Sequence, residues 1–217
     1  MVAPKTIQTV ADKRPQEPAP PQAETRVDAE AILQEILGPS SRCFEIVRRH
    51  GEQVARRALK AAGGLVGRRP DEGFLYEAAL LHDIGIYLTD TPQLDCHGPH
   101  PYILHGILGR RLLEARGLPR HALVCERHVG VGITTEEIRK RSLPLPLRDM
   151  RPVSVEEILI CYADKFYSKA GDRLTAERTF PEVARKLERY GRRQTETFIR
   201  WAERFEGLVL DQDDRPK

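Results

Sequence analysis

Six histidine and aspartate residues are set into otherwise apolar stretches of this sequence, and they are the residues best suited to chemistry. They are His50, His82, Asp83, His105, His128 and Asp164. An ionised carboxylate or an unpaired imidazole is costly to bury unless it is hydrogen-bonded or binds a metal ion. One inward-facing histidine is more commonly a hydrogen-bonded core residue. Six such groups together favour a metal site.

The types of these side chains narrow the choice of metal. Imidazole nitrogen and carboxylate oxygen without thiolate suit Fe, Mn, Co, Ni or Zn, and not calcium or a structural zinc finger. Neighbouring residues on a helix diverge by about 100°. His82 and Asp83 can therefore serve one centre only near a helix end, or if Asp83 bridges two ions. The residues alone predict a site with one or two metal ions.

The first segments that carry these residues have helical periodicity. A helix over residues 41–63, with serine before it and glycine after it, places His50 on its apolar face. A second helix begins near residue 71 and ends at His82 to Gly85, so its C-terminus presents His82 and Asp83 together.

Two further helices carry the later histidines. His105 begins the inward face of a helix that follows a Pro/Gly/His-rich loop over 91–101. Pro119 begins another helix, which ends with His128 before two nearby glycines. Both histidines are therefore expected near buried helix ends.

Two capping boxes predict the helices that follow. Thr134 with Glu137 and Ser154 with Glu157 have the required spacing. The second of these helices has an apolar face that continues to Phe166 and includes Asp164. No strand-like alternation is long enough to predict a sheet, so the predicted fold is all-α, a helical bundle.

Composition divides the chain into three parts. Residues 1–26 are rich in Pro, Ala, Gln and charge, and are predicted to form a disordered tail. Residues 27–210 form the predicted helical domain, and 211–217 a flexible C-terminus. Two amphipathic stretches, about 180–190 and 193–210, are expected to contribute packing and not chemistry.

Charge and cysteine usage exclude several classes of function. The 35 Lys+Arg against 32 Asp+Glu leave a net charge of +3, too small an excess for a module that binds long nucleic acids. The 4 cysteines form no C-x-x-C pair, which argues against a disulfide framework or a zinc ribbon and fits a reducing cytosol. No signal peptide or membrane-spanning apolar run is visible. A cytoplasmic protein without membrane contact is expected.

The order H…HD…H…H…D, with the string His82-Asp83-Ile84-Gly85, resembles the HD-domain metal-dependent phosphohydrolase superfamily over about residues 31–171. The stretches ERHVGVGIT at 126–134 and YADK at 162–165 resemble a small HDIG-type subfamily of predicted phosphohydrolases. An HD dipeptide alone is a weak signal, whereas the ordered set is specific. The resemblance implies an HD-domain helical bundle whose metal ligands are His50, His82, Asp83 and Asp164.

The resemblance also implies a dinuclear site. His105 and His128 match the extra ligands of HD proteins that hold two metals, among them dinucleoside tetraphosphatases and cyclic-dinucleotide phosphodiesterases. The implied cofactors are two divalent transition-metal ions, Fe or Mn first, with Zn, Co, Ni and Mg as alternatives. Asp83 would bridge the ions and orient a metal-bound water. Ile86 and Tyr87 follow the motif, where many relatives have a lysine.

The implied reaction is hydrolysis of a phosphoester or phosphoanhydride, since bound metal ions activate water and stabilise the leaving oxygen. The expected substrate is a small phosphorylated metabolite or nucleotide, and phosphomonoesterase, phosphodiesterase and nucleotide phosphohydrolase all remain open. The runner-up is an HD-type di-iron oxygenase. A non-catalytic signalling domain is a third reading, but it would have little reason to retain six costly polar groups. The expected partner is this small substrate, and a homodimer is left open.

Four residues are weaker candidates for binding substrate. Lys165 and Arg127 lie next to predicted ligands and could neutralise phosphate, although solvated helix residues have the same appearance. His97 and His100 could line the mouth of the site, but histidines in a surface loop are the commoner case.

Overall fold

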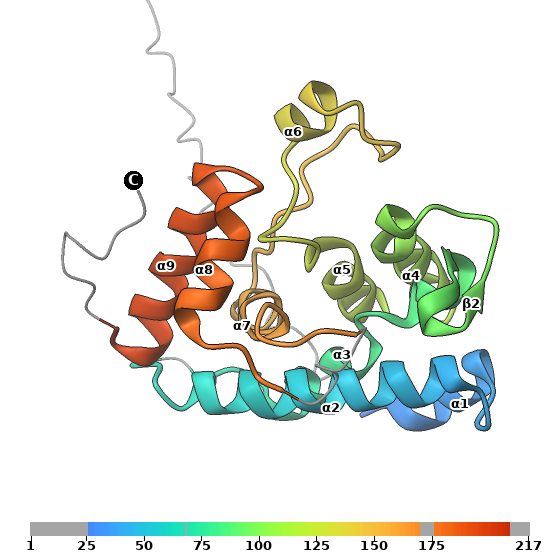
Figure 1. The fold of residues 1–217 in the computed structure, drawn as a ribbon. Coiled ribbons are helices and arrows are strands. Elements are labelled where there is room, and N and C mark those ends of the chain that lie inside the picture. The colour runs from blue at the N-terminus through green and yellow to red at the C-terminus, as the bar shows by residue number, and fades with distance from the viewer. Residues whose placement is uncertain (1–25, 68, 170–175, 209–217) are drawn as a thin grey trace, which may run out of the picture.

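The computed structural model describes residues 26–67, 69–169 and 176–208, and nearly all of their regular structure is helical (Figure 1). The α-helices are α1 (Ala29–Leu37), α2 (Arg42–Ala62), α3 (Glu72–Leu81), α4 (His105–Glu114), α5 (Pro119–Arg127), α6 (Thr135–Lys140), α7 (Val155–Asp164), α8 (Phe180–Glu188) and α9 (Arg192–Glu206). Three short 3-10 helices separate α3 from α4: η1 (Ile84–Leu88), η2 (Pro92–Leu94) and η3 (Tyr102–Leu104). The predicted all-α fold is confirmed.

A small hairpin interrupts the helices where the sequence analysis expected only a loop. Strands β1 (Asp90–Thr91) and β2 (Cys96–His97) pair antiparallel. Strands of two residues are too short to show an alternating pattern. Asp95 turns the chain before β2 in the left-handed conformation, with φ of 58°, which aspartate tolerates better than most residues.

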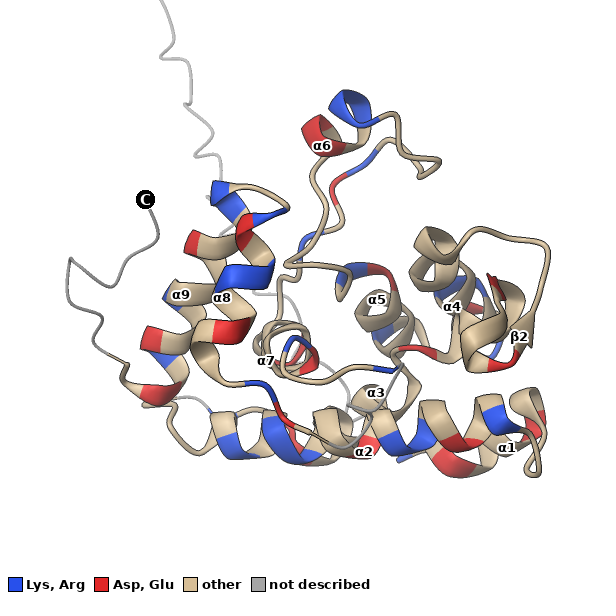
Figure 2. Cartoon of the chain, in the orientation of Figure 1, with Lys and Arg blue, Asp and Glu red and all other residues tan. Residues whose placement is uncertain are grey.

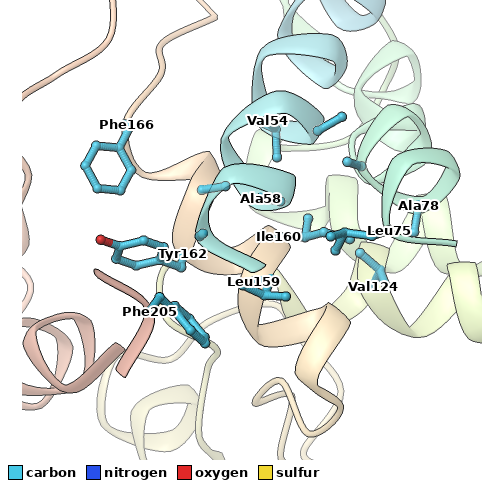
Figure 3. Close-up of a cluster of buried hydrophobic side chains, with 14 of the residues drawn as sticks. Val54, Ala58, Leu75, Ala78, Val124, Leu159, Ile160, Tyr162, Phe166 and Phe205 are labelled. Atoms are coloured by element: carbon cyan, nitrogen blue, oxygen red, sulfur yellow. The ribbon is translucent and has the colours of Figure 1, made fainter. Parts of the chain in front are cut away.

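The long helix α2 runs along one side of the molecule, and α1, α3 and α7 pack against it or beside it (Figure 1). Charged residues are spread along α1, α2, α8 and α9 (Figure 2). The side chains between α2, α3 and α7 form one buried apolar cluster, which includes Val54, Leu75 and Leu159 (Figure 3). This cluster fixes the positions of three helices that carry candidate ligands.

Side-chain caps begin both α2, where serine was predicted, and α3, where no cap was predicted. Ser41 accepts a hydrogen bond from the backbone N–H of Phe44 at 3.0 Å, and Asp71 caps α3 through the N–H groups of Gly73 and Phe74. These bonds satisfy N–H groups that have no partner within the helix. His50 faces inward and is 2% exposed, as the apolar stripe predicted.

Two glycines allow the helices to approach closely at the site. A Cβ atom on Gly51 would lie 2.8 Å from Leu80 Cα, so this glycine brings α2 against the end of α3. A Cβ on Gly85 would lie 2.1 Å from His105 O and 2.3 Å from Gly109 N. Gly85 therefore allows η1 to contact the first turns of α4, and it does not simply end a helix as the sequence suggested.

One of the two predicted capping boxes is complete. Thr134 and Glu137 bond each other reciprocally at the start of α6. Ser154 accepts from the N–H of Glu157 at 3.1 Å, but the Glu157 carboxylate bonds the N–H of Val153 at 2.7 Å instead of reaching Ser154. Helix α7 ends at Asp164, earlier than the apolar face to Phe166 suggested.

The last two helices, α8 and α9, pack against each other and close one end of the molecule. Glu206 at the end of α9 accepts a hydrogen bond from the buried Tyr162 hydroxyl at 2.6 Å and also pairs with Arg57 of α2. These contacts tie the C-terminal helices to α2 and α7.

Most of the predicted tail (1–26) and all of the predicted flexible C-terminus (211–217) lie outside the described residues. Arg26 is the described end of that tail, and its guanidinium pairs with Asp71 at 2.9 Å. None of the helices in the described ranges has the length and apolar content that a membrane span requires.

Candidate metal centre

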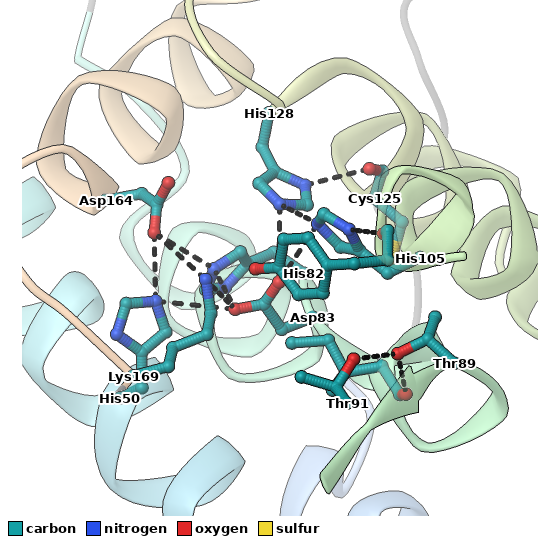
Figure 4. Close-up of polar contacts among 12 residues, drawn as sticks. His50, His82, Asp83, Thr89, Thr91, His105, Cys125, His128, Asp164 and Lys169 are labelled. Atoms are coloured by element: carbon teal, nitrogen blue, oxygen red, sulfur yellow. Dashed lines mark hydrogen bonds and ion pairs between the residues drawn. The ribbon is translucent and has the colours of Figure 1, made fainter. Parts of the chain in front are cut away.

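The six predicted ligands converge on one buried centre (Figure 4). Each comes from the middle or an end of a helix: His50 from α2, His82 and Asp83 from the end of α3, His105 from the first residue of α4, His128 from the end of α5, and Asp164 from the last residue of α7. All six are at most 8% exposed. The fold thus brings together residues that are up to 114 positions apart in sequence.

His50, His82, Asp83 and Asp164 form the first ligand group, whose donor atoms all lie within 4.8 Å of one another. His50 Nε2 is 2.9 Å from Asp164 Oδ1 and 3.4 Å from Asp83 Oδ2. His82 Nε2 is 3.0 Å from the same Asp83 oxygen. Two imidazoles and two carboxylates therefore face a common point.

Asp83, His105 and His128 form the second group. Asp83 Oδ1 is 3.4 Å from His105 Nε2 and 3.3 Å from His128 Nε2. The two carboxylate oxygens of Asp83 thus point to different groups, Oδ2 to the first and Oδ1 to the second. This is the arrangement that a bridging carboxylate requires.

Hydrogen bonds to the backbone orient three of the histidine rings. The Nδ1 atoms of these rings face the carbonyl oxygen three residues earlier: His82 faces Ala79 at 2.6 Å, His105 faces Tyr102 at 2.7 Å and His128 faces Cys125 at 2.8 Å. Carbonyl groups in the last turn of a helix lack a partner within it. Because a carbonyl only accepts, each Nδ1 carries a proton. Burial lowers the pKa of His105 and of His128, so these two rings are neutral and present their Nε2 lone pairs to the centre.

The direction of these lone pairs indicates whether a cation fits the site. His105 Nε2 and His128 Nε2 are 3.0 Å apart, so two neutral rings with protonated Nδ1 direct lone pairs at each other and at Asp83. Among the residues that the structure describes, neither buried oxygen of Asp83 has a hydrogen-bond partner in good geometry. Such a set of acceptors is stabilised by a positive ion between them. The donor set fits divalent transition-metal ions.

Burial and charge set the protonation of the histidines. Burial lowers the pKa of His105 to about 3 and that of His50 to about 4. Burial also disfavours the charged form of His82, but the neighbouring carboxylates outweigh it and raise the pKa of this ring to about 9. Burial opposes ionisation of Asp83, yet His82 and Lys169 hold its pKa well below the usual range.

Two lysines neutralise the carboxylates of the centre. Lys165 Nζ is 2.6 Å from Asp164 Oδ2 and donates to the His128 carbonyl at 3.1 Å. Lys169 Nζ is 2.7 Å from Asp83 Oδ2. The sequence analysis singled out Lys165 and missed Lys169. Helix α7 ends at Asp164, so Lys169 lies beyond the helix. Helical spacing could therefore not predict that Lys169 contacts Asp83.

A cavity of about 500 Å³ opens onto this centre. His105, His128 and Asp164 lie on its floor, and both lysines are on its wall. Tyr102 also lines the cavity and stacks on the His105 ring, with centroids 4.5 Å apart. The volume of the cavity lies within the range of about 300–1,000 Å³ that is typical of small-molecule sites.

Three of the four residues expected to bind substrate are not brought to this cavity. Arg127 forms two hydrogen bonds to the Glu157 carboxylate, at 2.9 and 3.0 Å, and does not line the cavity. The His97 side chain is 67% exposed beside Asp95, and His100 takes part in backbone pairing with Leu88 and Asp90. Lys165 does line the cavity. Adjacency in sequence misled for Arg127 because the next residue on a helix points away by about 100°.

Comparison with known proteins gives one family and several relatives. A family model described as HD domain matches residues 36–168. A tRNA (cytidine(56)-2'-O)-methyltransferase of Picrophilus torridus is 33% identical over 59% of this chain and 33% of its own length. An uncharacterized protein of Methanocaldococcus jannaschii is 35% identical over 56% of this chain and 66% of its own length. The chain thus spans one third to two thirds of these relatives. No solved structure matches.

Proposed function

Because the chain belongs to the HD domain family, we propose that it is a metal-dependent phosphohydrolase that acts on a small phosphorylated metabolite or nucleotide. One observation carries this proposal: two ligand groups that share Asp83 line a cavity whose wall also carries two largely covered lysines, Lys165 and Lys169. Metal ligands beside cations suit a substrate with phosphate oxygens.

The two groups assign the ligands. His50, His82, Asp83 and Asp164 would hold one ion, and Asp83, His105 and His128 the other. Imidazole and carboxylate ligands without thiolate suit divalent transition-metal ions, and the family resemblance places Fe or Mn first among them. Bound divalent ions supply Lewis acidity and lower the pKa of water to near neutrality. The protein residues hold the imidazole lone pairs in place through their bonds to the backbone.

The lysines would bind and position the phosphate. Lys165 and Lys169 have side chains only 10% and 13% exposed, beside the carboxylates. Burial strengthens the attraction between an ammonium group and an anion because the surroundings are less polar than water. The cavity accommodates a metabolite or nucleotide and is too small for most of a polymer, which supports a small substrate.

The names of two relatives concern tRNA methylation, and we do not transfer that activity. The matches cover 33% of the Picrophilus torridus methyltransferase and 26% of a second one with the same name, from Thermoplasma volcanium, so most of each relative has no counterpart in the match.

A substrate screen tests the proposal. Protein purified without chelator would be assayed for phosphate release from aryl phosphates and nucleotides, with added Mn or Fe, and for oxygen uptake. His128→Ala should lose activity because it removes a ligand of the second group. His97→Ala is the matched control, since this histidine is exposed and outside the cavity. Oxygen uptake without phosphate release would support the HD-type di-iron oxygenase instead.

A further inference from the structure

One wall of the cavity comes from outside the region that the family model matches. The match ends at residue 168, whereas Lys186 and Leu187 of α8 and Gln194 of α9 also line the cavity. The sequence analysis expected only packing from these helices. Residues that contact substrate from an added element are suited to recognising the part of it that does not react.

Lys186 differs from the other two cavity lysines in having no acidic partner. Lys165 pairs with Asp164, and Lys169 pairs with Asp83. Among the described residues, the Lys186 side chain forms no ion pair and no hydrogen bond. Figure 2 shows the basic residues along α8. Lys186 is an exposed residue of α8 whose side chain is partly covered at the cavity wall; this partial burial lowers its pKa, and the nearby charges of Arg178 and Lys165 lower it further. An anion at this position would relieve that repulsion.

A second cation faces the same cavity from another element. Arg141, at the end of α6, lines the cavity and has no side-chain ion pair within the described ranges. The neighbouring Glu137 is occupied by Arg193 of α9 at 2.6 Å. Glu137 therefore does not supply the charge that Arg141 and Lys186 lack.

We propose that Lys186, assisted by Arg141, forms a second anion-binding subsite, so that the preferred substrate carries a second phosphate or a carboxylate besides the phosphate that is hydrolysed. The inference rests on the proposed function for the reacting phosphate. The shared chemistry is an anionic group held by an ammonium and a guanidinium group. Lys186 is then a specificity residue, and its substitution leaves the ligands of the metal centre unchanged.

Two matched substrate pairs test this subsite and separate the two kinds of anion. Fructose 1,6-bisphosphate would be compared with fructose 6-phosphate, and 4-carboxyphenyl phosphate with phenyl phosphate. Lys186→Met should lower kcat/KM for at least one doubly anionic substrate by about 10- to 100-fold, the usual effect of losing a hydrogen bond to a charged group. For the matched substrate with a single anionic group, kcat/KM should change by less than about twofold. Arg185→Met is the control, because it removes a neighbouring α8 charge that does not line the cavity.

Binding of the same compounds, measured by calorimetry, separates this proposal from the proposed function. Tighter binding of a doubly anionic compound that depends on Lys186, without any hydrolysis, would support the subsite and contradict the phosphohydrolase. Hydrolysis with equal effects of Lys186→Met within both pairs would contradict the subsite alone. If neither assay shows a preference for a second anion that depends on Lys186, the subsite does not exist. Unfolding temperatures of both variants check that the fold is kept.

Discussion

Asp83 belongs to both ligand groups, so substituting it should affect both ions at once. Asp83→Asn keeps the shape of the side chain but removes the negative charge that faces His50 and His82 on one side and His105 and His128 on the other. We expect this variant to bind neither ion. His50→Ala and His105→Ala each remove a ligand from one group only and should each retain one ion.

The expected effect on stability follows from mass action. An ion present at 100 times its dissociation constant stabilises the folded state by about 2.7 kcal/mol, so two sites contribute about 5.4 kcal/mol. For a chain of 217 residues, each kcal/mol shifts the unfolding temperature by about 2–4 °C. The wild type should therefore gain about 11–22 °C with metal, His105→Ala about half of that, and Asp83→Asn nothing.

Metal content by mass spectrometry and calorimetric unfolding with and without added Mn would measure both effects. His97→Ala serves as the control, because its side chain is 67% exposed and lies outside both groups. If Asp83→Asn keeps the metal content and the thermal gain of the wild type, Asp83 is not the shared ligand and the reasoning from the two groups is wrong.

Three further substitutions test other parts of the structure. Arg127→Met should leave kcat/KM unchanged and lower the free energy of unfolding by about 1–3 kcal/mol in denaturant titrations, since it leaves the buried Glu157 carboxylate without its charged partner. A large loss of activity at unchanged stability would place Arg127 in the site after all. Gly85→Ala should lower the free energy of unfolding by about 1–3 kcal/mol and weaken metal binding, because its Cβ would meet His105 O. Gly63→Ala is the control, and equal unfolding free energies of these two variants would contradict the close approach of η1 to α4. Burial opposes a low pKa for Glu137, but its bonds to Thr134 and Arg193 outweigh this and lower the pKa below 4.5. Its stabilisation is therefore present above that pH and is lost as the pH falls through the folded-state value. Glu137→Gln should narrow the difference in unfolding free energy between neutral pH and about pH 3, and an undiminished difference would exclude this contribution.

Local signals in the sequence were sufficient to predict most of the helices and to single out the six candidate ligands. The caps at Ser41 and Thr134 were readable because a cap depends on residues three or four positions apart. The inward position of His50 followed from the apolar stripe of its own helix. The family resemblance rested on the order of the six candidate ligands along the chain, which can be recognised without knowing how far apart they lie in space. The match over residues 36–168 shows the family.

The surroundings of the ligands depended on the tertiary structure. Arg127 and Lys165 are each adjacent in sequence to a candidate ligand, yet Arg127 pairs with Glu157 and Lys165 with Asp164. Lys169 follows the end of α7, and Lys186 is more than a hundred residues from His82. Their places in the cavity result from how α7, α8 and α9 pack. Sequence periodicity determines which face of one helix is buried, whereas the charges that meet in a cavity are decided by contacts between helices that no local pattern encodes.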